Sequence, residues 1–143
     1  MISTLISSES RYPICRPKIK AKVEEVLRRF KVDEVEVSIM IFGDRKIRQL
    51  NKQYRQIDET TDVLSFALEE SRSEDGLLRL GDIAISYPQV QAIAREQNLL
   101  VDEVVNRLVE HGVLHLLGFE HDEFGDFKLN EQSTQFKISA AKN

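Results

Sequence analysis

Residues 111–121, HGVLHLLGFEH, end a long helical pattern and contain all three histidines of the chain. The overlapping run 104–117, VVNRLVEHGVLHLL, carries apolar residues at helical spacing and predicts a helix over residues 102–117. Gly118 predicts the end of this helix, because glycine adopts the left-handed cap conformation at little cost. We therefore expect the chain to turn at this glycine and to return toward the helix.

The three histidines of this stretch have the spacing of a metal site. His111 and His115 are four residues apart, which places both imidazoles on one helix face, about 6 Å apart along the axis. The turn at Gly118 brings His121 back toward them. Three imidazoles leave the fourth position of a tetrahedral zinc site for water, whose pKa zinc lowers from about 15.7 to near 7. The pattern favours one catalytic zinc ion per chain; ordinary surface or core histidines are the alternative interpretation.

One residue excludes a familiar class of zinc enzyme. The metalloprotease motif HExxH requires a glutamate directly after the first histidine as general base. Gly112 occupies that position and has no side chain to do this work. A protease of that type is not expected, although the histidines still permit a metal-dependent hydrolase with another substrate.

The composition is that of one globular domain. The chain has 143 residues, of which 41% are hydrophobic and 31% charged, as in ordinary soluble proteins. No apolar run approaches the roughly 18 residues of a membrane span, and the first residues lack the pattern of a signal peptide. The single cysteine, Cys15, excludes an internal disulfide and indicates a reducing compartment. We expect a cytoplasmic protein without a membrane partner.

The charge is unevenly distributed along the chain. The net charge of -4 argues against broad affinity for nucleic acid, DNA included. Residues 1–60 nevertheless carry 13 Lys+Arg against 9 Asp+Glu, whereas residues 61–143 carry 7 against 15. A basic first half that faces phosphates is one interpretation, and solvated helix surfaces are the other.

The remaining patterns predict an α/β fold with a mixed sheet and helices packed on it. The patterns also make three detailed predictions. The end of strand 35–42 is buried on both faces, Asp44 is the N-cap of the helix 45–55, and Tyr54 belongs to the buried stripe of that helix. Residues 69–76 are an acidic connection. We expect helices over 18–30, 45–55, 88–97 and 102–117. We expect strands over 3–6, 35–42 and 62–66, and one within 77–87 that is clearest at 82–86.

Three stretches, taken in order, resemble the motifs of one family. HGVLHLLGFEH is similar to the signature HGxLHLxGaxH of the YbeY family of bacterial endoribonucleases, in which a is aromatic. Residues 54–66, YRQIDETTDVLSF, resemble that family's YRxxDxxTDVLSFP, and residues 81–86, GDIAIS, resemble its GDIxIS. The similarity covers most of residues 34–122. It implies a single domain over residues 1–143, with a four-stranded mixed sheet flanked by helices and a metal at one edge.

The resemblance also implies site residues and a function. His111, His115 and His121 match the family's metal-binding histidines, and Arg55 matches the arginine of its YR pair, a catalytic group that contacts RNA. His115 is taken as catalytic as well. The implied activity is that of a zinc-dependent endoribonuclease that cuts single-stranded RNA. Its partners would be ribosomal RNA, at the 3′ end of the small-subunit RNA, and the small subunit, in rRNA maturation and ribosome quality control.

Other polar residues have two interpretations each. The guanidinium of Arg55 matches phosphate geometry, but an arginine at a helix end also pairs with terminal carbonyls. We expect Ser65 either to face a cleft beside the metal or to fill a turn. Asp82 is expected either to orient a metal-bound histidine or to cap the end of a strand. The acids beside His121, Glu120 and Asp122, accept protons or are solvated loop residues.

Two departures from the family pattern limit the comparison. Ala67 stands where the family has proline after LSF, and the tail 123–143 lacks a clean helical stripe because Gly125 interrupts it. Two rival functions therefore remain: a metal-dependent hydrolase of another substrate, and a non-catalytic ribosome-assembly factor with structural zinc.

Overall fold

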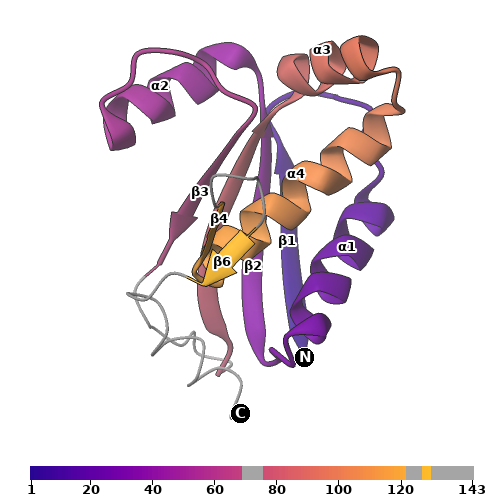
Figure 1. Ribbon diagram of the computed structural model, residues 1–143, viewed down its shortest axis with the longest axis vertical. Helices are drawn as coiled ribbons and strands as arrows, with labels where there is room; N and C mark the ends of the chain where they lie inside the picture. Colours follow the sequence, from indigo (N-terminus) through magenta and orange to yellow (C-terminus); the bar gives the residue numbers. More distant parts are fainter. Residues whose placement is uncertain (69–75, 122–126, 130–143) are drawn as a thin grey trace.

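The computed structural model describes residues 1–68, 76–121 and 127–129, with the backbone alone at residues 120–121 and 127–129. Its centre is a four-stranded sheet of order β1-β2-β4-β3 (Figure 1). Strands β1 (Ile2–Ser8), β2 (Val35–Phe42) and β4 (Leu78–Ser86) are parallel, and β3 (Val63–Ala67) pairs antiparallel with β4 at one edge. The expected mixed four-stranded sheet is confirmed.

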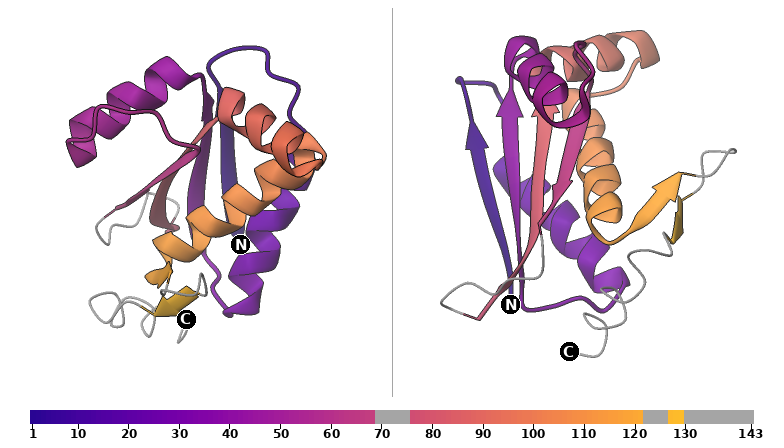
Figure 2. Two further views of the ribbon diagram at one scale, coloured as in Figure 1. Left: turned by 45° about the horizontal axis from the view of Figure 1, so that its top comes forward. Right: turned by 90° about the vertical axis from the view of Figure 1, so that its left-hand side faces the viewer.

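Helices cover the two faces of this sheet unequally. Helices α1 (Arg16–Arg29) and α4 (Val101–Leu116) lie together on one face (Figure 2). On the opposite face α2 (Asp44–Arg55) packs over one end of the sheet. Helix α3 (Tyr87–Gln97) joins β4 to α4, and its buried residues belong to the main core. None of the helices in the described part of the chain is long and apolar enough to cross a membrane.

The main core lies between the sheet and the helices α1 and α4. Alternate residues of β2 face these helices and are at most 1% exposed, as the two-residue period of a strand requires. In α1 the buried residues fall at spacings of four, three and one, which form one stripe of a helix. The residues concerned are Val35, Val37, Ile39 and Ile41 of β2, and Ile19, Val23, Val26 and Leu27 of α1.

The predicted burial of the end of β2 on both faces is wrong. Met40 and Phe42 are only partly buried, so the strand alternates to its end. Tyr54 is also not part of a buried stripe, since it is 57% exposed whereas Ile47 on the same helix is fully buried. The physical reason is that α2 covers only one end of this face. A continuous apolar run therefore overstates burial where the covering helix is short.

The predicted boundaries of the helices and strands agree closely with the structure, with two differences. Strand β1 extends over Ile2–Ser8 rather than 3–6, because it pairs in parallel with β2 along its whole length. A small second sheet of β5 (Phe119–His121) and β6 (Phe127–Leu129) follows α4 and was not predicted. The acidic connection at 69–75 and the tail, apart from the backbone of β6, lie outside the described residues.

Candidate active site

Helix α4 presents His111 and His115 near its C-terminal end. The helix ends at Leu116, and Gly118 has φ +95°, the left-handed conformation expected of a glycine at a helix end. The spacing of four residues puts both imidazoles on one face of the helix. His111 is partly buried and His115 is exposed. The predicted helix that carries both histidines, and its end at Gly118, are confirmed.

Gly112 brings this end of α4 close to the sheet. A Cβ atom added at Gly112 would lie 2.7–2.9 Å from three side-chain atoms of Ile83 in β4, closer than real Cβ atoms approach. Ile83 is fully buried and cannot move aside. The residue that excludes the HExxH motif therefore has a packing role, because it sets the distance between the histidine-bearing helix and β4.

The third histidine stands in a different element. After the turn at Gly118, β5 begins at Phe119, whose ring lies 4.9 Å from that of Phe30 in α1. His121 pairs through its backbone with Phe127 of β6, and its side chain lies outside the described residues. Among the described side chains no three His, Cys, Asp or Glu come together as potential ligands. The donor set is consistent with zinc as far as it is described: two imidazoles from one helix face, with a third histidine just past the helix end.

A pocket of ≈ 380 Å³ brings three of the candidate residues together. Arg55 at the end of α2, Ser65 in β3 and His115 in α4 all line it, and they come from three separate elements. Its volume is within the range of small-molecule sites. We call this hollow the cleavage pocket, after the activity that the resemblance implies. A cation, a hydroxyl and an imidazole thus face one space, which suits an anionic substrate.

Ser65 reaches the cleavage pocket because of its place in the strand. It is paired with Ile83, whose side chain faces α4, so Ser65 points to the same side of the sheet. The interpretation of Ser65 as a cleft residue is the one that fits. Asp82 is different: neighbouring side chains alternate, so it faces away from α4. The interpretation in which Asp82 orients a histidine of that helix is therefore wrong.

The loop that follows Arg55 is hydrogen-bonded back to α2. Asn51 is 3% exposed, and its amide nitrogen donates a 2.9 Å hydrogen bond to the backbone oxygen of Glu59. The backbone nitrogen of Ile57 donates to the backbone oxygen of Asn51 at 3.3 Å. These bonds fold residues 56–62 back along the helix, so that β3 begins beside the end of α2. Sequence reasoning missed Asn51; the signal was a polar residue four positions after Ile47, on the buried side of the helix.

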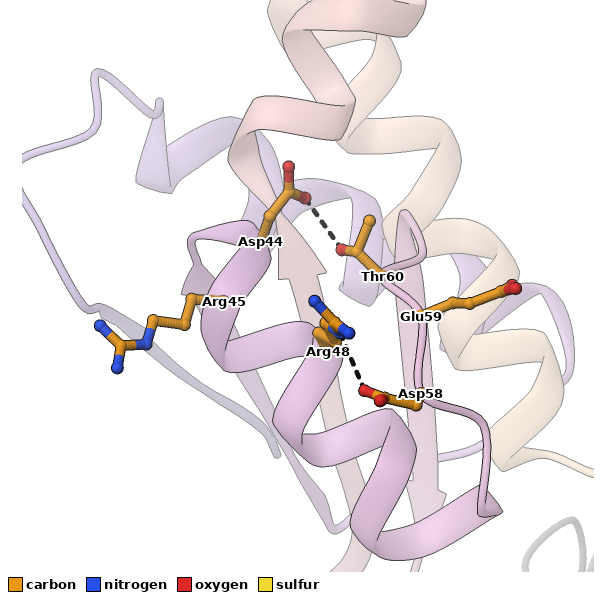
Figure 3. Close-up of a pocket in the computed structure, with 6 residues that line it drawn as sticks. All are labelled: Asp44, Arg45, Arg48, Asp58, Glu59 and Thr60. Carbon is orange, nitrogen blue, oxygen red and sulfur yellow. Dashed lines mark hydrogen bonds and ion pairs between the residues drawn. The ribbon is translucent and has the colours of Figure 1, made fainter.

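A second hollow, of ≈ 540 Å³, lies at the start of α2 (Figure 3). There the carboxylate of Asp44 accepts hydrogen bonds from the Thr60 hydroxyl at 2.9 Å, the Ser86 hydroxyl at 2.6 Å and the Gln89 amide at 3.2 Å. Burial favours the neutral carboxyl, but the three donors outweigh it, so the pKa of Asp44 is lowered. The predicted N-cap role of Asp44 is wrong, because Gly43 is the N-cap.

The residues around this second hollow connect helices and a loop, and we assign them no catalytic role. Through Asp44 it connects α2, the loop before β3 and the start of α3. On its other side Arg48 and Asp58 form an exposed ion pair at 2.8 Å, whereas Arg45 points away from both (Figure 3). None of the candidate histidines lines it. Its consequence for the cleavage pocket is indirect, since it fixes the loop that leads into β3.

Comparison with known proteins gives consistent matches over most of the chain. The family model for endoribonuclease YbeY matches residues 6–139. Endoribonuclease YbeY of Aquifex aeolicus is 40% identical over 130 residues, which cover 88% of this chain and 85% of the relative. The Persephonella marina enzyme of the same name is 39% identical over 109 residues, or 76% and 71% of the two chains. The solution structure of TM1509 from Thermotoga maritima has a TM-score of 0.58 and 30% identity, and covers 99% of this chain and 87% of that one.

Proposed function

We propose a function from one premise: the chain belongs to the endoribonuclease YbeY family. The protein is a zinc-dependent endoribonuclease that cuts single-stranded RNA in the cytoplasm. Its substrate is ribosomal RNA, at the 3′ end of the small-subunit RNA, in maturation and quality control of the ribosome. The observation that carries this proposal is the cleavage pocket, where Arg55 and His115 line one space although they are 60 positions apart in the chain.

His111, His115 and His121 would hold the metal. Once bound, zinc supplies Lewis acidity toward a phosphodiester oxygen and lowers the pKa of water. The chain contributes the position of these ligands. Gly112 sets how close α4 lies to β4, and the turn at Gly118 directs the backbone to His121. His115 also lines the cleavage pocket, so the ligand set and the substrate space share one residue.

Arg55 acts on the phosphate itself. Its guanidinium has a planar set of N–H donors that fits two phosphate oxygens, and its positive charge stabilises the charge that develops during phosphoryl transfer. It lines the cleavage pocket from the exposed end of α2. The bonds of Asn51 to the following loop restrict where this end of the helix lies relative to β3. Water or the neighbouring RNA 2′-hydroxyl is the nucleophile, and a 2′,3′-cyclic phosphate product identifies the hydroxyl.

The deciding experiment compares cleavage of labelled single-stranded RNA by matched preparations of wild type, His115→Ala and Arg55→Ala, with and without chelator. We expect His115→Ala and the chelated wild type to lose cleavage. Arg55→Ala should lower the rate by about 10²–10³, as when one charge-stabilising donor is removed. Arg55→Lys serves as the control that keeps the charge but loses the planar donor set. Equal cutting by wild type and His115→Ala would identify a contaminating nuclease and favour the assembly-factor function.

A further inference from the structure

A third hollow, lined mostly by apolar residues, lies on the sheet face that α2 only partly covers. It has a volume of ≈ 550 Å³ and is formed between α2 and the neighbouring strands. The partly buried end of β2 forms its floor, which is why the burial expected there from the sequence is absent. We call it the sheet hollow; its lining residues include Met40, Phe42, Lys46, Tyr54, Phe66, Ala67 and Asp82.

Tyr54 is the exposed aromatic residue of the sheet hollow. Its side chain is 57% exposed, whereas Ile47 on the same helix is fully buried. Its ring centroid is 5.0 Å from that of Phe66, at an interplanar angle of 57°, so Phe66 supports one side of the ring. A supported aromatic ring with an exposed surface is the platform on which nucleobases stack in single-strand binding proteins.

Positive charge lies in the hollow and next to it. Helix α2 carries five Lys or Arg residues against a single acid; Arg55 lines the adjacent cleavage pocket, and Arg45 and Arg48 line the hollow at the start of the helix. Lys46 lines the hollow, with its ammonium 6.0 Å from the centroid of the Phe42 ring. Asp82 adds a carboxylate that can accept hydrogen bonds from the amino groups of a base. A lysine beside an aromatic floor, next to the arginine of the cleavage pocket, fits single-stranded RNA better than an apolar protein segment.

The sheet hollow and the cleavage pocket are adjacent. Ala67, the last residue of the edge strand β3, lines both of them. Tyr54 and Arg55 are consecutive residues at the end of α2, and Tyr54 lines the hollow while Arg55 lines the pocket. An RNA strand that crosses the end of β3 at Ala67 can therefore occupy both sites.

We propose that the sheet hollow is a nucleobase subsite: a base of the RNA strand stacks on Tyr54 while the scissile phosphate lies beside Arg55 in the cleavage pocket. Lys46 binds the backbone of the same strand. This proposal rests on the proposed function, since it assumes that the strand in the cleavage pocket is RNA. It goes further by assigning to α2 and the far face of the sheet a binding role separate from the metal and from the phosphate contact.

The first test measures cleavage kinetics of the full chain with wild type, Tyr54→Ala, Tyr54→Phe and Gln53→Ala. Gln53 is the matched control, because it is exposed on the same helix and lines neither hollow. Tyr54→Ala should raise KM about 5- to 150-fold with little change in kcat, the effect of losing one base–aromatic stack. Tyr54→Phe keeps the ring and should stay near wild type, as should Gln53→Ala. A KM of Tyr54→Ala equal to that of wild type overturns the subsite.

The second test replaces single nucleotides of the RNA with abasic sites. At one position, the abasic site should raise the KM of wild type. It should not change the KM of Tyr54→Ala, because the aromatic stacking partner is already missing in that variant. If every abasic position affects the two proteins equally, the subsite is wrong even if cleavage is normal. If wild type does not cut RNA at all, the proposed function fails, and the subsite fails with it. A change in self-association of Tyr54→Ala, measured by light scattering without a change in KM, would assign the hollow to protein contact instead.

Discussion

The two faces of the sheet differ in how completely helices cover them. On the face under α1 and α4, the side chains of β2 are almost fully removed from water. On the opposite face the buried cluster consists of Ile47, Leu64 and Ala84, and the side chains around it are only partly buried. The first face supplies most of the apolar burial, and the second leaves the sheet hollow open. Most of the apolar burial and the proposed base contact thus lie on different sides of one sheet.

The largest expected effect comes from truncating Ile39 in β2. The next residue, Met40, is the comparison, because its side chain faces the opposite side of the sheet. Ile39 is fully buried against the helices, whereas Met40 lines the sheet hollow. Ile39→Ala should lower the free energy of unfolding by about 2–5 kcal/mol, the usual cost of a cavity in a core. Met40→Ala should cost clearly less, because its side chain is already partly hydrated. Urea denaturation measures both, and equal losses would show that the two faces are equally important for stability.

A smaller effect is expected at the contact between α4 and β4. Gly112→Ala places a methyl group against Ile83 and should destabilise the protein by about 1–3 kcal/mol, as overpacking does. The double variant Gly112→Ala, Ile83→Ala is the control, since the shortened side chain makes room for the methyl group. In that background the penalty of Gly112→Ala should vanish, leaving the gain in helix propensity, which is up to about 1 kcal/mol. A penalty that persists in the double variant would contradict close packing as its cause.

The smallest effect concerns the carboxylate of Asp44 and depends on pH. Its folded-state pKa is below the ordinary value of 3.8, so the charged carboxylate stabilises the fold above that pH and this contribution is lost as the pH falls through the folded-state pKa. Asp44→Asn should therefore lower the free energy of unfolding at neutral pH, by about 1 kcal/mol. In acid, below the folded-state pKa, the variant and the wild type should converge. Denaturation curves at several pH values test this, and a difference that is constant with pH would exclude the charge as its source.

Local patterns predicted most of the elements, because helix and strand periods and glycine caps act over a few residues. The histidine helix with its end at Gly118, and the order of strands and helices, follow from such patterns. The resemblance of the motifs to the YbeY family added Arg55 as a site residue, and the structure places it with His115 in one pocket. Binding of zinc by the three histidines stays a prediction.

Other features could not be predicted, because they depend on which elements pack against each other. The apolar run at the end of β2 has the pattern of a strand buried on both faces, and only the short reach of α2 leaves Met40 exposed to the hollow. Asn51 had no recognisable role in the sequence and Asp44 was expected only as an N-cap, because their partners come from the loop before β3 and the start of α3. Asp82 looked like a neighbour of the histidines, but strand alternation turns it away from α4.

Sequence alone was sufficient for the chemical character of this protein: three histidines at ligand spacing, an arginine in a family motif, and the succession of helices and strands. Spacing and residue type are properties of a short segment, so they can be recognised without the fold. Tertiary structure alone decided that Arg55 and His115 line one pocket, that Gly112 brings α4 against β4, and that Tyr54 stands over an open hollow. These results depend on contacts between segments far apart in the chain, which no local pattern specifies.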